Sequence, residues 1–168
     1  MTIKNSSPDS KNNTCYFAVA ILIGLLTGVV GSAFHQVLDF SQHYVPQLPF
    51  ILGLSGWQAY VFLTVFVVLM FCGAVALVRH FAPEASGSGI QEVEGAMIVK
   101  REVRWRRVLP VKFIGGCMAL GAGLVGGREG PTIHMGASIA QALSERFKLA
   151  GQDARSWLGA GAAAGLAT

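Results

Sequence analysis

Two short glycine-rich motifs hold the polar side chains whose types and spacing could bind ions in this 168-residue chain. The motifs read Gly87-Ser88-Gly89-Ile90-Gln91-Glu92-Val93-Glu94 and Gly126-Gly127-Arg128-Glu129-Gly130-Pro131-Thr132-Ile133-His134-Met135-Gly136. In both, glycines break the chain just ahead of a new apolar segment. The start of a helix presents unpaired N–H groups and the positive end of its dipole, so each motif could hold an anion.

The first motif predicts a helix start at Ser88. Serine is a favoured N-cap residue, and the flanking Gly87 and Gly89 leave the backbone free to turn. Within a membrane, such a start attracts an anion through partial charges, without the desolvation cost of a buried lysine or arginine. Ser88 and Gln91 also fit the S-x-x-Q capping box of ordinary helices, so a purely structural role is the alternative.

The second motif predicts a new helix whose first residue is Pro131, because proline suits that position. Glu129 would then lie just ahead of the free N–H groups, where an anion would bind. A charge at bilayer depth costs about 2.5–3.5 kcal/mol on insertion scales, so the Arg128-Glu129 pair requires a reason. The alternative to an ion-binding role is a capping carboxylate paired with Arg128.

The composition indicates that these motifs lie in a membrane protein. Hydrophobic residues make up 52% of the chain and charged residues 13%, which leaves too little polar surface for a soluble domain. Residues 16–38 and 57–78 contain no Asp, Glu, Lys or Arg, and each is long enough to cross a hydrocarbon layer of about 30 Å. Gly24, Gly28 and Gly31 predict close packing of the first span against another helix.

The distribution of basic residues predicts the topology. The 39–56 segment has neither Lys nor Arg and is expected outside, whereas Lys4, Lys11 and a basic cluster are expected on the cytoplasmic side of a plasma or inner membrane. We expect residues 1–13 to form a cytoplasmic tail and residues 14–168 to form part of a transmembrane domain. The basic cluster consists of Lys100, Arg101, Arg104, Arg106 and Arg107.

The part of the chain from residue 82 onward is divided into short apolar pieces by glycines, prolines and charges. Helices are predicted over residues 90–99, 108–127, 132–147 and 154–168, and no segment has the pattern of a strand. Broken helices at membrane depth are tolerated where they line a cavity or are buried in protein. The sequence therefore predicts an all-α, multi-pass protein with tilted and broken helices around a solute pathway.

Other classes of function find little support in the sequence. The three cysteines, Cys15, Cys72 and Cys117, stand alone in apolar stretches and predict packing residues, with no metal site and no cofactor. No pattern typical of a hydrolase or metalloprotease occurs, so we expect no enzyme, and the basic cluster is better explained by topology than by nucleic-acid binding. His35 is either a functional polar group or an interfacial residue.

The order and spacing of the motifs resemble the CLC family of chloride channels and chloride/proton exchangers. Glu129 follows Ser88 by 41 residues, a basic stretch lies between them, and Gly161-Ala162-Ala163-Ala164-Gly165 follows. The resemblance covers residues 14–168, and Gly-Arg-Glu-Gly-Pro is its most specific motif. It implies part of the first inverted repeat of a CLC-type fold, with chloride as substrate, protons as a second substrate and a homodimer in the family.

The resemblance also implies roles for individual residues. Ser88, with the backbone of Gly87, Gly89 and Ile90, would coordinate the central chloride. Glu129 would be the gating glutamate, whose protonation frees an outer anion site. The remaining chloride-binding residues implied by the motif are Arg128, Gly130 and Pro131.

The sequence departs from the family pattern in two places. Gln91 replaces the usual proline, and the chain stops at Thr168, before the internal proton glutamate, the second chloride motif, the chloride-coordinating tyrosine and the dimer helices would come. We therefore expect a truncated CLC-type chain. The alternative is a small membrane scaffold or nonfunctional fragment, in which Arg128 and Glu129 form a structural ion pair.

Overall fold

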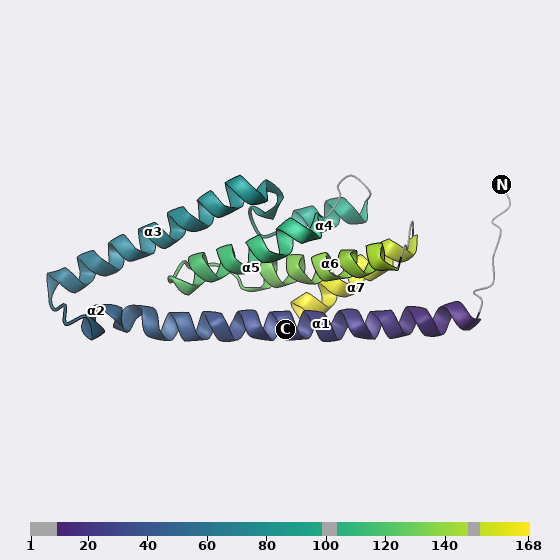
Figure 1. Cartoon of the computed structure of the whole chain (residues 1–168), viewed down its shortest axis with the longest axis horizontal. Helices are drawn as coiled ribbons and strands as arrows, with labels where there is room; N and C mark the ends of the chain where they lie inside the picture. Colours follow the sequence, from purple (N-terminus) through teal and green to yellow (C-terminus); the bar gives the residue numbers. More distant parts are fainter. Residues whose placement is uncertain (1–9, 99–103, 148–151) are drawn as a thin grey trace.

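The computed structural model describes residues 10–98, 104–147 and 152–168, and these residues form helices and no strands (Figure 1). The first nine residues of the predicted tail lie outside the described residues. Two 3₁₀ turns, Val45–Gln47 and Pro83–Ala85, join the α-helices. The helices are α1 Ser10–Tyr44, α2 Leu48–Ile51, α3 Trp57–Phe81, α4 Ile90–Met97, α5 Trp105–Gly121, α6 Glu129–Arg146 and α7 Gln152–Leu166.

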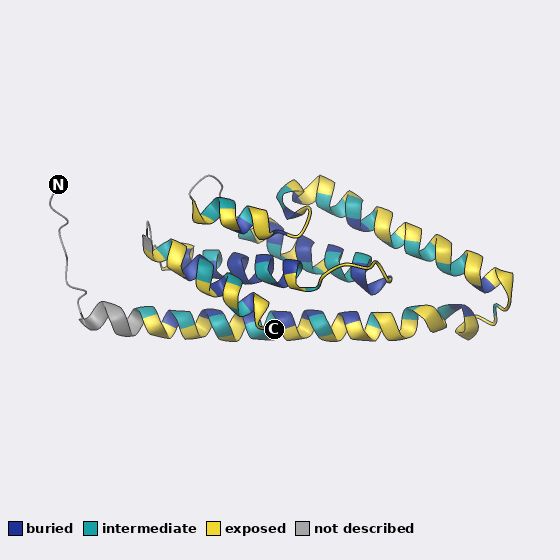
Figure 2. Ribbon diagram, turned by 180° about the vertical axis from the view of Figure 1, so that it is seen from behind, coloured by how far each residue is buried: buried dark blue, intermediate teal, exposed yellow. Residues whose placement is uncertain are grey.

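The helix α1 forms one long rod along the molecule, and α3 returns along the opposite side (Figure 1). Among the described residues, two segments are long and apolar enough to cross a membrane, Tyr16–Ile51 with 36 residues and Trp57–Phe81 with 25. Almost all of α3 is accessible, and its only buried residues are Ala59 and Ala74 (Figure 2). An apolar helix with so little protein around it fits a lipid environment.

Two details of the first span differ from the prediction. The helix continues past residue 38 to Tyr44, since helix breakers come only with Pro46 and Pro49. The predicted close packing is seen at Gly31, which lies against Thr168. A Cβ at Gly24 or Gly28 would meet no described atom outside its own helix turn within 4 Å.

The helix α6 lies at the centre of the molecule and packs against α1, α5 and α7. Ten of its residues are buried, including Met135, Ala137 and Ala140. Phe34 and Leu38 of α1 meet Leu120 of α5 and Met135 of α6 in one buried cluster. This packing fixes where α6 begins, and its first residues carry the second motif.

The contact between α6 and α7 depends on glycine. A Cβ at Gly161 would lie 2.7 Å from the Cβ of Ala140, and a Cβ at Gly165 would lie 2.7 Å from the carbonyl carbon of Thr132. Small residues four apart allow helix backbones to approach this closely, which is how membrane helices gain packing contacts. The Gly161 to Gly165 motif therefore forms the close contact between α7 and α6, which is called the seam between α6 and α7 below.

The ends of α4 to α7 differ by a few residues from the predicted ranges. The largest difference is in α5, which was predicted over residues 108–127 and is observed as Trp105–Gly121. Gly123 has a φ of 102°, which a right-handed helix cannot accommodate, and residues 124–127 follow in a nonhelical conformation.

The cysteine predictions have a mixed outcome. Cys117 packs against the buried cluster around Phe34, whereas Cys72 is exposed on α3 and does not pack in the protein. Both thiols are free. The side chain of Cys15 lies outside the described residues.

Candidate functional site

The structure brings the two glycine-rich motifs into direct contact. A Cβ at Gly130 would lie 2.8 Å from the carbonyl oxygen of Ser88 and 3.0 Å from its Cβ. A side chain at position 130 would therefore push the two segments apart, and glycine is the residue that permits the approach. The start of α6 and the loop before α4 form one site, although 41 residues separate Ser88 from Glu129.

The helix α4 begins at Ile90, as predicted, but its N-cap residue differs from the prediction. The N-cap is Gly89, not Ser88, and its φ of 88° lies in the left-handed region that glycine adopts without strain. The Ser88 hydroxyl stays close to the helix start, since its Oγ accepts a hydrogen bond from the Ile90 N–H at 3.4 Å. The predicted capping role of Ser88 is thus replaced by a contact within the turn.

The start of α6 also differs from the prediction. Arg128 is the N-cap, Glu129 the first helical residue and Pro131 the third, whereas Pro131 was predicted to be first. Proline is tolerated here because the first four N–H groups of a helix have no partner within the helix. Thr132 Oγ1 donates a hydrogen bond to the Glu129 carbonyl oxygen at 2.8 Å.

Arg128 and Glu129 do not form the ion pair that the scaffold alternative assumed. Arg128 Nη1 donates to Asp39 Oδ1 at 2.7 Å, and Arg128 Nη2 donates to Gln42 Oε1 at 2.8 Å. Gln42 Nε2 in turn donates to the Leu120 carbonyl oxygen at 3.2 Å. These bonds tie the start of α6 to α1 and to the end of α5. Within the described residues, the exposed Glu129 carboxylate has no hydrogen bond or ion pair.

Lys112 belongs to this site, and sequence reasoning missed it. Its side chain is 5% exposed, and Nζ donates to the carbonyl oxygens of Ala85 at 3.0 Å and Gly87 at 2.5 Å. The ammonium therefore fixes the loop that carries Ser88. The signal was present in the sequence, because a lysine inside an apolar helix is costly unless it has partners.

His134 is a second residue that the sequence did not single out. Its side chain is 1% exposed, and a Cβ at Gly89 would overlap its ring. The ring therefore packs directly on the start of α4. No described residue makes a hydrogen bond to Nδ1 of this histidine.

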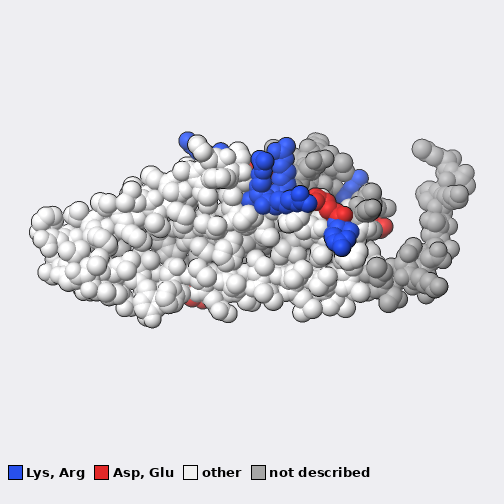
Figure 3. Space-filling view, viewed as in Figure 1, with Lys and Arg blue, Asp and Glu red and all other residues white. Residues whose placement is uncertain are grey.

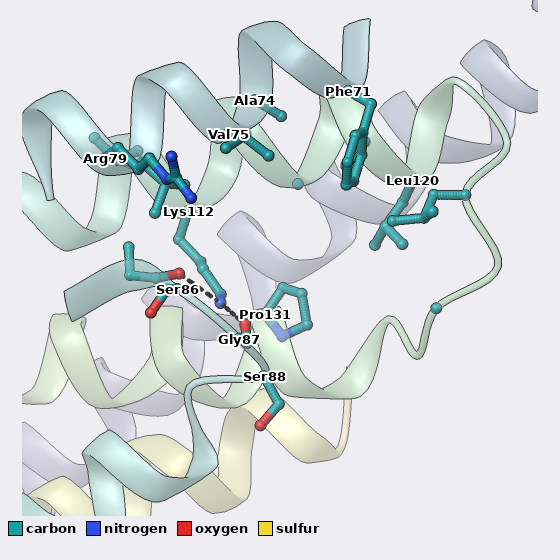
Figure 4. A pocket seen from close by; sticks show the side chains of 18 of the residues that line it. Phe71, Ala74, Val75, Arg79, Ser86, Gly87, Ser88, Lys112, Leu120 and Pro131 are labelled. Carbon is teal, nitrogen blue, oxygen red and sulfur yellow. Dashed lines mark hydrogen bonds between the residues drawn. The ribbon is translucent and has the colours of Figure 1, made fainter. Parts of the chain in front are cut away.

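A cavity of about 490 Å³ lies between α3, α5 and the two motifs. Lys112 reaches from α5 toward Gly87, and Pro131 lies close to its ammonium (Figure 4). Of the predicted site residues, the cavity lining includes Gly87, Ser88 and Pro131. The other predicted site residues are outside the lining, namely Gly89, Ile90, Arg128, Glu129 and Gly130. The rest of the lining is mostly apolar side chains of α3 and α5. The buried ammonium of Lys112 and two helix starts therefore lie at this cavity, and groups of both kinds attract anions.

Comparison with known proteins identifies relatives among chloride transport proteins. The family model described as voltage gated chloride channel matches residues 69–168. The H(+)/Cl(-) exchange transporter ClcA of Vibrio cholerae serotype O1 (strain ATCC 39541 / Classical Ogawa 395 / O395) is 46% identical over 164 residues, which are 94% of this chain and 34% of that relative. ClcA of Citrobacter koseri is 42% identical over 150 residues, 88% of this chain and 31% of the relative.

One solved structure has the same fold. The crystal structure of a slow cyanobacterial Cl-/H+ antiporter matches with a TM-score of 0.86 and 39% identity. The match covers 90% of this chain and 36% of the antiporter chain. This chain thus spans about a third of the length of the curated relatives that it matches.

Proposed function

This chain belongs to the voltage gated chloride channel family, and we propose that it forms the chloride-binding part of a CLC-type chloride/proton exchange pathway. The observation that carries the proposal is the contact between Gly130 and Ser88 beside the buried ammonium of Lys112. Two helix starts and one fixed positive charge meet there in an otherwise apolar membrane chain. The relatives named above, an H(+)/Cl(-) exchange transporter and a Cl-/H+ antiporter, support the choice of chloride and protons as substrates.

Chloride would be bound by partial charges and one full charge. An ammonium has three N–H donors, and the hydrogen bonds of Lys112 to Ala85 and Gly87 use two of them, which leaves one for an anion in the cavity. The Ser88 hydroxyl and the backbone from Gly87 to Ile90 supply further donors at the start of α4. Because the lysine is held by neutral carbonyl groups, no carboxylate cancels its charge at these bonds.

Glu129 would act as the gate. As the first residue of α6 it can place its carboxylate over the same free N–H groups that would bind the outer chloride. Carboxylate and chloride then exclude each other, so protonation of Glu129 and chloride binding become coupled. Gly130 and Pro131 serve the gate by holding the helix start close to Ser88.

The proposed location is a membrane crossed several times, with the N-terminus on the cytoplasmic side. The two apolar segments support crossing, and the basic residues around α5 support the orientation. The 39–56 segment, which lacks Lys and Arg, would face outward.

Chloride and proton flux from liposomes tests the proposed site. The protein, as its gene encodes it, would be compared with Glu129→Gln and Ser88→Ala, and with Asp153→Asn as a control for loss of an exposed carboxylate. Glu129→Gln mimics the protonated gate, so we expect chloride flux to persist while proton flux falls at least about tenfold. Ser88→Ala should reduce the preference for chloride over nitrate. Unchanged fluxes and selectivity in both variants would count against the site.

A further inference from the structure

A group of arginines surrounds a second pocket, away from the candidate chloride site. The pocket has a volume of about 340 Å³ and is lined by Arg104, Trp105, Arg106, Arg107 and Glu145. Three guanidinium groups against one carboxylate leave an excess of two positive charges. Figure 3 shows that basic side chains gather in one region of the face in view, while the larger part of that face carries no charge.

The carboxylate in the pocket has other partners. Glu145 Oε2 accepts a hydrogen bond from Trp105 Nε1 at 2.8 Å, and Oε1 accepts one from Gln141 Nε2 at 3.4 Å. Among the described residues, Arg104, Arg106 and Arg107 form no ion pair. The Arg106 guanidinium lies 5.3 Å from the centre of the Trp105 ring, which orients it without neutralising it.

The backbone adds to this positive charge. The pocket lies at the start of α5, a helix of 17 residues with no acidic side chain in its first turn. Helix starts are stabilised by negative charge, and this one carries arginines instead. An external anion would supply the missing charge, and arginine forks match the geometry of phosphate oxygens.

We propose that this pocket binds the phosphate headgroup of an anionic phospholipid. Tryptophan beside basic residues is typical of membrane interfaces, where the ring lies at headgroup level. Large apolar side chains are exposed close by in the sequence, with Ile98 at the end of α4 63% exposed and Phe147 after α6 45% exposed. Exposed apolar side chains within a few residues of the arginines in the sequence favour a lipid over a soluble phosphate as the occupant. This proposal depends on the chain lying in a membrane, but it does not depend on the proposed chloride transport.

Lipid retention by the full chain tests the proposal. Detergent-purified protein would be titrated with phosphatidylglycerol or phosphatidylcholine, and bound lipid counted by native mass spectrometry. We expect phosphatidylglycerol to be retained more tightly, and Arg104→Gln/Arg107→Gln to weaken its retention by about thirtyfold, in line with the usual effect of two basic residues at a membrane surface. The control Arg146→Gln/Arg155→Gln removes two exposed arginines outside the pocket and should change retention less than about twofold.

One further variant and one competition measurement distinguish lipid binding in the pocket from a general effect of charge and from binding of free phosphate. Arg104→Lys/Arg107→Lys keeps the charge but loses the guanidinium forks, so retention should fall between that of the original protein and the glutamine variant. Inorganic phosphate should not displace the lipid. Equal retention of the two lipids, an equal loss in the control, or displacement by inorganic phosphate would each overturn the lipid assignment.

Discussion

At the scale of single residues, Lys112 illustrates how a membrane protein can hold a buried charge without a carboxylate. Its ammonium is bonded to the carbonyl oxygens of Ala85 and Gly87, so it is solvated by the backbone of the loop that it stabilises. The same bonds make it both a structural and an electrostatic part of the candidate site.

We expect Lys112→Gln to weaken chloride binding by about tenfold, because a hydrogen bond to a charged group contributes more than one between neutral groups. Glutamine keeps N–H donors for the loop carbonyls but has no charge. Isothermal titration with chloride in detergent measures the effect, and Lys112→Arg, which keeps the charge, is the control. If the glutamine variant binds chloride as tightly as the original protein, Lys112 has no electrostatic role.

The bond between Arg128 and Asp39 should contribute little stability by itself. Both side chains are partly exposed, at 34% and 66%, and such pairs contribute about 0.2–1 kcal/mol. A double-mutant cycle with Asp39→Asn and Arg128→Gln, followed by thermal or chemical unfolding, should give a coupling energy in that range. A coupling near zero would mean that Gln42 alone holds Arg128.

At the scale of the elements, the seam between α6 and α7 should be the least tolerant contact. Gly161→Val would force branched carbons into the backbone of α6, and overpacking of this kind costs about 1–3 kcal/mol or more. Gly28→Ala is the matched control, because no described atom lies within 4 Å of the position a Cβ would take there.

We expect the control to leave the free energy of unfolding unchanged or to raise it by up to about 1 kcal/mol, because alanine is favoured over glycine inside a helix. Unfolding in mild detergent, followed by circular dichroism, compares the two variants. A large loss at Gly28 would indicate that its exposed face is covered by protein, which the described residues do not show.

The helices themselves were predictable from the sequence, and so were the first residues of α3 and α4, but the first residues of α5, α6 and α7 were not. Apolar periodicity and glycine breaks located α3 through α7 to within a few residues. The start of α6 was misplaced because proline is compatible with several first-turn positions, and Pro131 occupies the third. The partner of Arg128 could not be predicted, since Asp39 lies 89 residues away and only tertiary packing brings α1 alongside α6.

At the scale of the whole molecule, the prediction concerns topology. After replacement of Cys15, Cys72 and Cys117, a cysteine at Ser55 or at Asp153 would report the side on which each loop lies. Ser55→Cys, between α2 and α3, should react with a membrane-impermeant thiol reagent from outside intact cells. Asp153→Cys, near the start of α7, should react only after the cells are opened. Labelling of both from outside would contradict the proposed orientation.

The length of α1 has a consequence for the bilayer around the molecule. Its 35 residues extend about 50 Å, well beyond a hydrocarbon layer of about 30 Å, so the helix must slant or protrude. Lipids with longer acyl chains would favour a more upright rod. Asp39 and Gln42 of α1 are bonded to Arg128 at the start of α6. A change in the tilt of α1 would therefore pull on the first turn of α6 and shift the Glu129 carboxylate relative to Ser88.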